Sequence, residues 1–304
     1  MYLQHFGLRE LPFTLTPNAH FFLNMASYHK AYNMLMVSLA NAEGFIKIVG
    51  EVGTGKTMLC RKVLNTLEED KESYITAYIP NPVLSPKGLF LAFAEELDLN
   101  VEQDIGYHRL LKAITEKLVE YSANSKQVVL FIDEAHAMPE QTLEALRLLT
   151  NIETEQAKLF QVVLFAQPEI DVALAQPSLR QLRQRITFSF TIESLDREGT
   201  ERYVVHRLAT AGYNGPFLFT RRAVDNLYRA SEGIPRVINI LCHKALMVAF
   251  GRGERTVQID HVRSAADDTE GVELPSNNYR PAFIAIAGIF VGAALIFYVG
   301  RFYL

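Results

Sequence analysis

The sequence predicts an α/β fold with a parallel sheet flanked by helices, followed by an all-helical domain and a single C-terminal transmembrane helix. Between residues 44 and 190, apolar strand-like runs alternate with helical periodicity, which is the pattern of βαβ units. From Leu195 to Asp268 the strand signals disappear and helical periodicity continues alone. Residues 282–300 contain no charge and no strongly polar side chain. These three observations define the order of the expected elements.

The individual elements follow from the apolar runs and from the turn and capping residues between them. Five strands are expected, at Phe45–Val49, Tyr74–Ile79, Val128–Ile132, Phe160–Phe165 and Ile186–Phe190. Four helices are expected to begin near Asp196, Thr220, Pro235 and Asp260. The later string GVELPSNN has no periodicity and is typical of a linker. We therefore expect an α/β domain at residues 1–192, a helical domain at 193–270, a linker at 271–281 and a transmembrane helix at 282–300.

Composition limits the class of protein. The 304 residues, 49% hydrophobic and 21% charged, are enough for two globular units. A net charge of −4 gives no overall signature of nucleic-acid binding, so a nucleic-acid partner is not expected. Cys60 and Cys242 lie in apolar helical patterns and are predicted to be reduced core thiols. The first ten residues contain no long apolar run, so we expect no cleaved secretory signal and a cytoplasmic N-terminal domain.

The strongest motif is GEVGTGKT at Gly50–Thr57, which fits the P-loop pattern at every fixed position. It follows the apolar run FIKIV and precedes a helical run, as the loop requires. The glycines let backbone N–H groups face phosphates, Lys56 reaches the β and γ phosphates, and the Thr57 hydroxyl binds Mg²⁺. ATP and Mg²⁺ are therefore the expected ligands. The predicted nucleotide-binding residues are Gly50, Glu51, Val52, Gly53, Thr54, Gly55, Lys56, Thr57 and Met58.

A second motif, FIDEAH, ends an apolar run with two adjacent carboxylates. Because strand ends of a parallel sheet face the ligand crevice, Asp133 suits the Mg²⁺ shell and Glu134 can polarise the attacking water. The alternative is that both carboxylates only cap the next helix. His136 completes the string DEAH, which also occurs in helicases. No second helicase-type core is present, so we interpret His136 as incidental.

Polar and basic residues follow the next predicted strand. Gln167 ends the run LFQVVLFAQ and is placed to reach the γ-phosphate or the water, although capping of the turn explains it nearly as well. Arg180, Arg183 and Arg185 precede the last strand. Either they form a solvated basic helix face, or one of them supplies a cation to the γ-phosphate of a neighbouring subunit. Arg185 is the preferred candidate for that role and Arg183 the second.

Six strings in order resemble the AAA+ ATPases of the general secretion pathway A, or ExeA-like, family: GEVGTGKT, FIDEAH, FAQPEI, LRQRI, YVVHRLATAG and EGIPRVIN. Within that family the resemblance is greatest to ATPases of mannose-sensitive haemagglutinin (MSHA) pilus biogenesis, and it covers about residues 1–270. It implies a P-loop AAA+ fold, ATP at the joint between the α/β domain and a helical lid, and self-association into a hexameric ring. It also implies that Arg236, in the string GIPR, is a second sensor touching the nucleotide. Packing within the lid is the alternative role for this arginine.

The apolar segment at residues 282–300 is predicted to anchor the protein in a membrane. At about 1.5 Å per residue it makes about 28 Å of helix, close to the roughly 30 Å hydrocarbon core. A buried core helix is the alternative, but the segment has no amphipathic face. Arg280 and Arg301 flank it evenly, so orientation follows from the ATP site, which needs cytoplasmic nucleotide. We expect a single-pass protein of the bacterial inner membrane whose ATPase domain is cytoplasmic, with only Arg301–Leu304 on the far side.

The resemblance and the anchor together imply a membrane-anchored AAA+ ATPase that couples ATP hydrolysis to assembly or remodelling of an envelope machine. That machine is an MSHA-type IV pilus or a type II secretion system, with inner-membrane pilus or secretion proteins as partners. Two alternatives stay open. A DNA-acting AAA+ ATPase of the transposition or helicase-loader type shares most motifs. A non-hydrolysing, nucleotide-switched scaffold keeps every motif except the need for Glu134.

Overall fold

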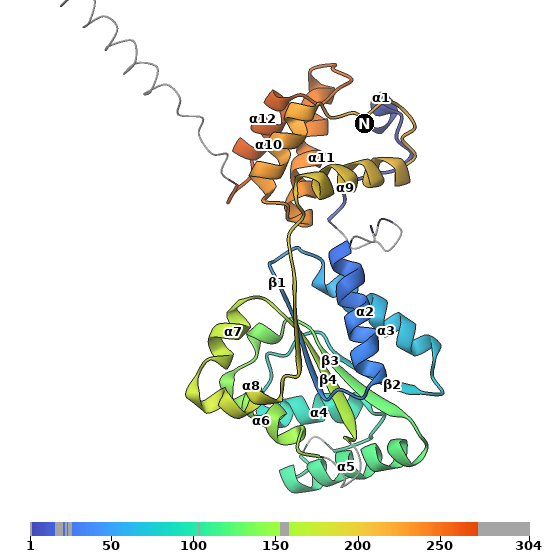
Figure 1. Ribbon diagram of the computed structural model, residues 1–304, viewed down its shortest axis with the longest axis vertical. Helices are drawn as coiled ribbons and strands as arrows, with labels where there is room; N and C mark the ends of the chain where they lie inside the picture. Colours follow the sequence, from blue (N-terminus) through green and yellow to red (C-terminus); the bar gives the residue numbers. More distant parts are fainter. Residues whose placement is uncertain are drawn as a thin grey trace, which may run out of the picture.

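The described part of the chain forms an α/β domain and a helical domain, which lie end to end in an elongated molecule (Figure 1). The computed structural model describes residues 2–15, 21, 23, 26–102, 104–152 and 158–272. The predicted transmembrane segment, and the predicted linker from residue 273 on, lie outside these residues. Within the described ranges, no helix is both long enough and apolar enough to cross a bilayer.

A five-stranded parallel sheet lies at the centre of the α/β domain, in the order β2-β3-β4-β1-β5. The strands are β1 Phe45–Gly50, β2 Tyr74–Ile79, β3 Gln127–Ile132, β4 Phe160–Ala166 and β5 Phe188–Ile192. All five predicted strands are confirmed, although β5 begins later than expected because its pairing with β1 starts at Phe188. Every residue of β1 and β4 is buried, since both strands lie inside the sheet and are covered on both faces.

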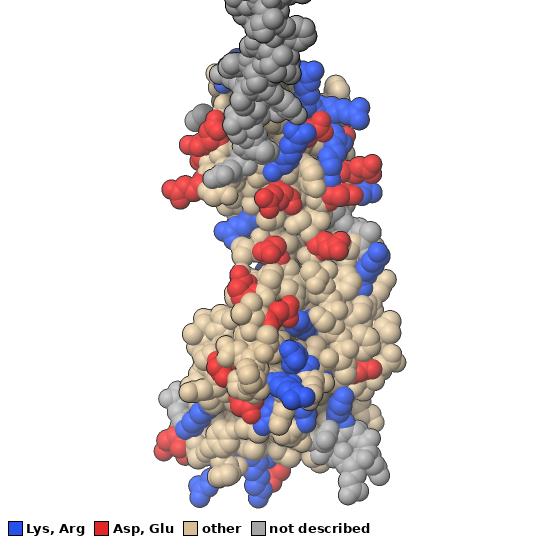
Figure 2. All heavy atoms as spheres, turned by 60° about the vertical axis from the view of Figure 1, so that its left-hand side comes forward, with Lys and Arg blue, Asp and Glu red and all other residues tan. Residues whose placement is uncertain are grey.

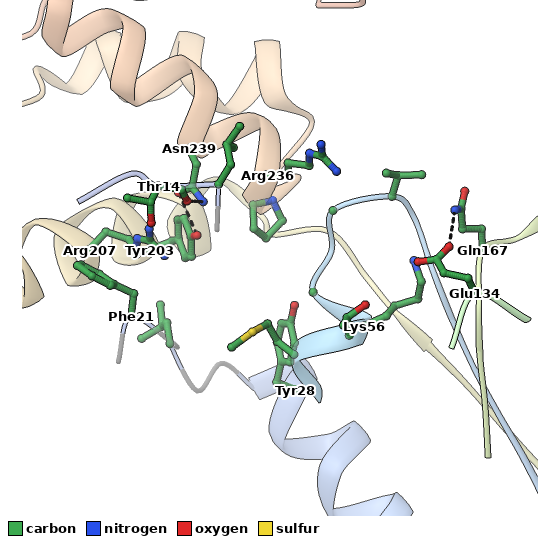
Figure 3. Close-up of a pocket in the computed structure, with 18 residues that line it drawn as sticks. Thr14, Phe21, Tyr28, Lys56, Glu134, Gln167, Tyr203, Arg207, Arg236 and Asn239 are labelled. Carbon is green, nitrogen blue, oxygen red and sulfur yellow. Dashed lines mark hydrogen bonds between the residues drawn. The ribbon is translucent and has the colours of Figure 1, made fainter. Parts of the chain in front are cut away.

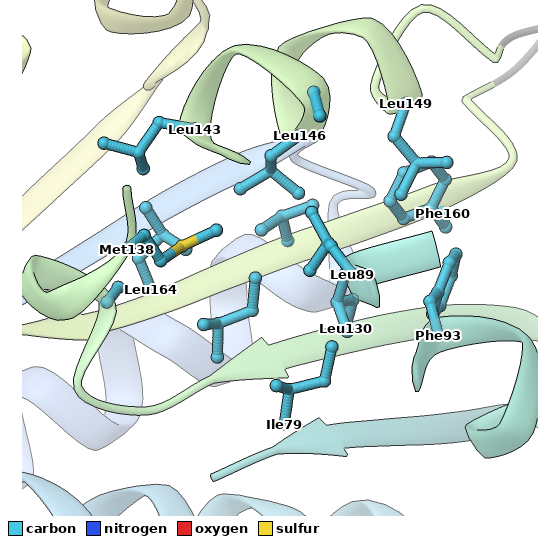
Figure 4. Close-up of a cluster of buried hydrophobic side chains, with 14 of the residues drawn as sticks. Ile79, Leu89, Phe93, Leu130, Met138, Leu143, Leu146, Leu149, Phe160 and Leu164 are labelled. Atoms are coloured by element: carbon cyan, nitrogen blue, oxygen red, sulfur yellow. The ribbon is translucent and has the colours of Figure 1, made fainter. Parts of the chain in front are cut away.

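Alternate residues of the inner strands face two opposite layers of helices. In β3, Leu130 joins one apolar core with Phe93 and Leu146, whereas Phe131 joins the other core with Leu59 (Figure 4 shows the first). The layer over Leu130 contains α4 Pro86–Glu96, α5 Tyr107–Ala123, η2 Ala135–Ala137, α6 Glu140–Leu149, α7 Glu169–Leu174, η3 Pro177–Leu179 and α8 Arg180–Arg185. The layer over Phe131 contains α2 Ala26–Ala40 and α3 Lys56–Glu69.

The helical domain, called the lid below, contains the four helices that the sequence predicts. They are α9 Arg197–Thr210, α10 Arg221–Ser231, α11 Pro235–Gly251 and α12 Ile259–Asp267. Asp196 accepts a hydrogen bond from the Gly199 N–H at 2.6 Å, and Thr220 caps α10 in the same way. Pro235 occupies the first position of α11, where no N–H is needed. These caps explain why sequence reasoning located the helix starts closely.

The N-terminal segment departs from the expected domain boundaries. We expected residues 1–192 to form one α/β unit, but α1 (Tyr2–Phe6) packs on the lid. Tyr2, Phe6 and Phe13 are buried in the same apolar core as the lid helices. These aromatic side chains bury more apolar surface there than the short helix would bury alone, so the segment belongs to the lid core.

Both cysteines lie where the composition placed them. Cys60 is buried in the core of the α/β domain and Cys242 in the core of the lid, and neither forms a disulfide. The prediction that both cysteines are core residues is confirmed.

Candidate functional site

The P-loop connects β1 to α3 through two residues in the left-handed backbone region. Gly53 has φ of 82° and Gly55 has φ of 96°, a region that favours glycine. A Cβ at Gly53 would lie 2.5 Å from the Cβ of Arg236, and a Cβ at Gly55 would lie 2.1 Å from the hydroxyl oxygen of Tyr28. Glycine is therefore needed here both for backbone conformation and for close approach.

Gly55→Ala is expected to destabilise the fold by roughly 2 kcal/mol or more, because the new Cβ meets both a left-handed φ and the buried Tyr28 hydroxyl. Thermal unfolding measures this loss. The matched control is Gly106→Ala at the N-cap of α5, where a Cβ meets nothing within 4 Å, and its effect should be smaller, at most about 1 kcal/mol, because only the cap changes. Adding Tyr28→Phe to Gly55→Ala should restore part of the stability. Equal melting temperatures for the Gly55 and Gly106 variants would contradict the close approach.

Lys56 begins α3 and turns back over the loop. Its side chain is buried, and Nζ donates to the carbonyl oxygens of Gly50 at 2.7 Å and Glu51 at 3.0 Å. Burial lowers the pKa of Lys56, while the nearby carboxylates of Glu134 and Asp133 oppose this shift. The ammonium group thus stands at the loop's concave side, where phosphate oxygens can replace the carbonyl acceptors.

Thr57 and Asp133 form an oxygen pair that fits a magnesium ion. Thr57 Oγ1 donates to Asp133 Oδ2 at 2.8 Å, and Asp133 Oδ1 accepts from the Glu134 N–H at 2.9 Å. Mg²⁺ prefers such hard oxygen ligands and usually takes the remainder from water and substrate phosphates. The described residues contain no cluster of three or more His, Cys, Asp or Glu that would hold a metal ion by itself. These residues therefore fit Mg²⁺ bound together with a nucleotide.

Asp133→Asn is expected to stabilise the nucleotide-free protein by about 1 kcal/mol and to remove the stabilisation that MgATP gives. Burial raises the pKa of Asp133 above its ordinary value of 3.8, although the bonds from Thr57 and Glu134 oppose the shift, so its ionised form costs stability at neutral pH. At acid pH the Asp133 carboxylate is protonated and loses its charge. The gain in stability of the Asn variant over the parent should therefore vanish at acid pH. Thermal unfolding with and without MgATP, at neutral and at acid pH, measures both effects. An unchanged MgATP shift in the variant would count against the magnesium assignment.

Glu134 is held at the tips of two neighbouring strands. It has φ of 51°, an uncommon conformation for a non-glycine residue, and it lies two residues after the end of β3. Gln167, at the tip of β4, donates from Nε2 to Glu134 Oε2 at 3.1 Å. His136 lies beside both, because its Nδ1 accepts from the Gln167 N–H at 3.4 Å and its Nε2 lies 3.6 Å from Glu134 Oε2. The structure thus brings Glu134 and Gln167 together, with His136, interpreted from sequence as incidental, against them.

Arg236 lies at the start of α11, where the lid meets the P-loop. Its backbone N–H donates to the Gly53 carbonyl oxygen at 3.3 Å, and its side chain is exposed and lines the cavity described below. The structure therefore places this residue where the sequence resemblance expected it, beside the nucleotide-binding loop. Its role as a sensor of the nucleotide stays a prediction.

The candidate arginines of α8 do not line the cavity. Arg185 Nη1 donates to the Thr150 carbonyl oxygen at 2.7 Å, and Nη2 donates to Asn151 Oδ1, so this side chain holds the end of α6. Arg183 is exposed on the same helix. Figure 2 brings the side of α7 and α8 forward, and Lys and Arg side chains gather over the α/β half of that face. Either arginine would therefore have to act on a neighbouring molecule.

One cavity of about 410 Å³ lies between the P-loop, the lid and the N-terminal segment (Figure 3). One end holds the phosphate-type residues Lys56, Thr57, Glu134 and Gln167. The other end is formed by the lid and by residues before β1. Those residues are Thr14, Leu15, Phe21, Leu23, Tyr28, Tyr203, Arg207 and Asn239.

Sequence reasoning missed this second end of the cavity. Tyr203 OH donates to Asn239 Oδ1 at 3.1 Å, Asn239 Nδ2 donates to the Thr14 carbonyl oxygen at 3.5 Å, and Arg207 Nε donates to the Pro12 carbonyl oxygen at 2.5 Å. The pairs are far apart in sequence, so no local spacing marks them. Tyr203 and Arg207 are four residues apart on α9, and their burial is visible only in the structure.

The fold and these side chains define a class, the P-loop nucleotide-binding domain of the AAA type. Residues 40–174 match the family model described as "AAA domain". Over 288 residues the chain is 39% identical to general secretion pathway protein A of Aeromonas hydrophila, a match that covers 95% of this chain and 52% of that protein. The chain therefore spans about half the length of this curated relative. The similarity to a secretion pathway A protein, predicted from the motifs, is confirmed.

Solved structures share the fold over most of the chain. The ORC2 protein of Aeropyrum pernix has a TM-score of 0.60 at 14% identity, covering 86% of this chain and 74% of its own. Cdc6p of Pyrobaculum aerophilum has a TM-score of 0.63 at 14% identity, with 83% and 71% covered. The RuvB Holliday junction branch migration motor of Thermotoga maritima has a TM-score of 0.53 at 17% identity, with 83% and 72% covered. At these identities the likeness concerns the fold alone.

Proposed function

We propose that this protein is a membrane-anchored AAA+ ATPase that couples ATP hydrolysis to assembly or remodelling of a bacterial envelope machine. The observation that carries the proposal is the convergence of Lys56, Thr57, Glu134 and Gln167 at one end of a single cavity, with Asp133 bonded to Thr57. The solved ORC2 structure in complex with ADPNP and ADP supports a nucleotide as the ligand of this fold. The envelope role rests on the similarity to general secretion pathway protein A.

The side chains divide the chemistry among them. The P-loop N–H groups and Lys56 hold the β and γ phosphates, and Glu134 orients and polarises the attacking water while Gln167 fixes its carboxylate. Thr57 and Asp133 would hold Mg²⁺, which would supply positive charge to neutralise the phosphates. Arg236 acts as the sensor that links the bound nucleotide to the lid, because its N–H donates to the Gly53 carbonyl oxygen at the start of α11. No covalent intermediate is required.

Self-association into a hexameric ring would bring a cation from the next subunit to the γ-phosphate. We assign this role to Arg185, with Arg183 as the second candidate. The bonds from Arg185 to Thr150 and Asn151 fix it at one edge of the α/β domain, away from its own cavity. A rigidly held arginine loses little entropy when it meets a neighbouring phosphate, which suits this task.

A mixing experiment tests turnover and the shared site together. The full-length protein in detergent should hydrolyse ATP with a specific activity that rises with concentration, and Arg185→Ala and Lys56→Ala should each be inactive alone. Mixed, the two variants should recover activity, because the Lys56 variant supplies Arg185 to the intact P-loop of the other. Arg183→Ala is the matched variant and should stay active. Recovery with the Arg183 variant instead would reassign the residue, and tight ATP binding without turnover would leave a nucleotide-switched scaffold.

The membrane anchor is tested separately, by alkaline extraction of cell membranes. We propose that residues 282–300 cross the inner membrane once with the ATPase domain in the cytoplasm, and that inner-membrane pilus proteins of the MSHA type or secretion proteins are the partners. Full-length protein should stay with the membrane pellet, and a variant lacking residues 282–300 should appear in the supernatant. Protease added to intact spheroplasts should leave the ATPase domain uncut. Extraction of the full-length protein would contradict the anchor.

A further inference from the structure

Arg207 is a buried cation that has no counter-ion in the described part of the chain. Its relative exposure is 6%, and within the described residues it forms no ion pair with a carboxylate. The charges of two other buried cations have an explanation, because Lys47 pairs with Asp171 and Lys56 belongs to the P-loop. An isolated buried charge is costly unless something compensates it. A group that compensates the charge of Arg207 would therefore lie near its guanidinium.

The guanidinium of Arg207 is only partly satisfied by its neighbours. Nε donates to the Pro12 carbonyl oxygen, and the group stacks on Phe21 with 4.4 Å to the ring centre. Nη2 is buried and has no hydrogen-bond acceptor among the described residues. Burial lowers the pKa of Arg207, with Tyr203 opposing the shift. An arginine in this setting stays protonated, so its charge acts on whatever occupies the adjoining space.

That space is the end of the cavity opposite the phosphate-type residues (Figure 3). Here Asn239 is already bonded to Tyr203 and Thr14 through both its amide groups. The neighbouring lining residues Leu23 and Met58 are apolar. Among the described lining residues, Arg207 is the charged side chain at this end, since Lys56, Glu134 and Arg236 lie at the P-loop. When the phosphates of ATP are held at the P-loop, this end of the cavity is the space that remains for the adenine base.

We propose that Arg207 determines how the base is recognised, because its uncompensated positive charge attracts the ring-nitrogen acceptors of a purine. The inference rests on the proposed binding of ATP at this cavity. In a water-poor pocket such an attraction is stronger than in solution. Arg207 also holds the N-terminal segment through Pro12 and Phe21, so base recognition and the position of that segment depend on one side chain.

Nucleotide analogues test the attraction directly on the unaltered full-length protein. The 1-deaza, 3-deaza and 7-deaza forms of ATP each replace one ring nitrogen by C–H. Unaltered protein should bind one of the three about tenfold more weakly than ATP. Arg207→Met keeps the length of the side chain without its charge, and it should bind ATP and that analogue equally well. Arg207→Lys should retain part of the discrimination.

Tripolyphosphate separates a contact with the base from damage to the site. It carries no base, so Arg207→Met should bind it as the parent does. The control is Arg202→Met, which changes an exposed arginine on the same helix. This variant should bind both tripolyphosphate and ATP as the parent does. Equal binding of all three analogues and ATP by the unaltered protein would overturn the proposal, as would a Met variant that loses tripolyphosphate to the same extent as ATP. Unaltered protein that binds neither ATP nor tripolyphosphate would instead refute the proposed function.

Discussion

Lys56→Met should lower the affinity for MgATP by about 100-fold and abolish hydrolysis. The methionine keeps the buried stem but removes the ammonium group whose Nζ donates to the Gly50 and Glu51 carbonyl oxygens. Of the described residues that line the phosphate end, the other cation is Arg236, which belongs to the lid. Calorimetric titration with MgATP measures the loss.

The matched control is Arg61→Ala, an exposed position on the same helix, which should bind MgATP normally. Thermal unfolding without nucleotide distinguishes a binding defect from an unfolded loop, since both variants should melt close to the parent. Near-normal MgATP affinity in the methionine variant would mean that the nucleotide does not sit on this loop.

Glu134→Gln should leave MgATP binding within about threefold of the parent and slow hydrolysis roughly 100-fold to 1000-fold. The amide keeps the size of the side chain and can still accept the bond from Gln167, but it cannot polarise water as a carboxylate does. Single-turnover hydrolysis of prebound ATP measures the chemical step without the contribution of product release.

Gln167→Ala tests the partner of Glu134. Removing its Nε2 donor frees the carboxylate to move, so turnover should fall about tenfold while MgATP affinity changes little. Unchanged turnover in Glu134→Gln would contradict its assignment as the group that activates water. Turnover lost equally in both variants would mean that the pair acts as one unit.

The sheet and the phosphate end of the site were predictable because they are encoded locally. The glycines of the P-loop, the lysine after them and the carboxylates after β3 each occur at a strand end, where parallel strands place functional groups side by side. Only the distances, such as 2.8 Å between Thr57 Oγ1 and Asp133 Oδ2, required the structure.

The opposite end of the cavity was not predictable from local patterns. Arg207 and Pro12 are brought together by the packing of α1 and Phe13 on the lid, which depends on tertiary burial of aromatic side chains. A basic residue in a lid helix is normally interpreted as surface charge, because arginines are rarely buried. The bonds of Arg185 to Thr150 and Asn151 were hidden for the same reason, since they join residues far apart in sequence.

Because α1 packs on the lid, the chain crosses between the two domains twice, once between Phe13 and α2 and once between Ile192 and Asp196. A body attached at one point can turn in every direction, whereas a body attached at two points turns most freely about the line that joins them. We therefore expect the lid to move mainly by rotation about the line that joins these two connections.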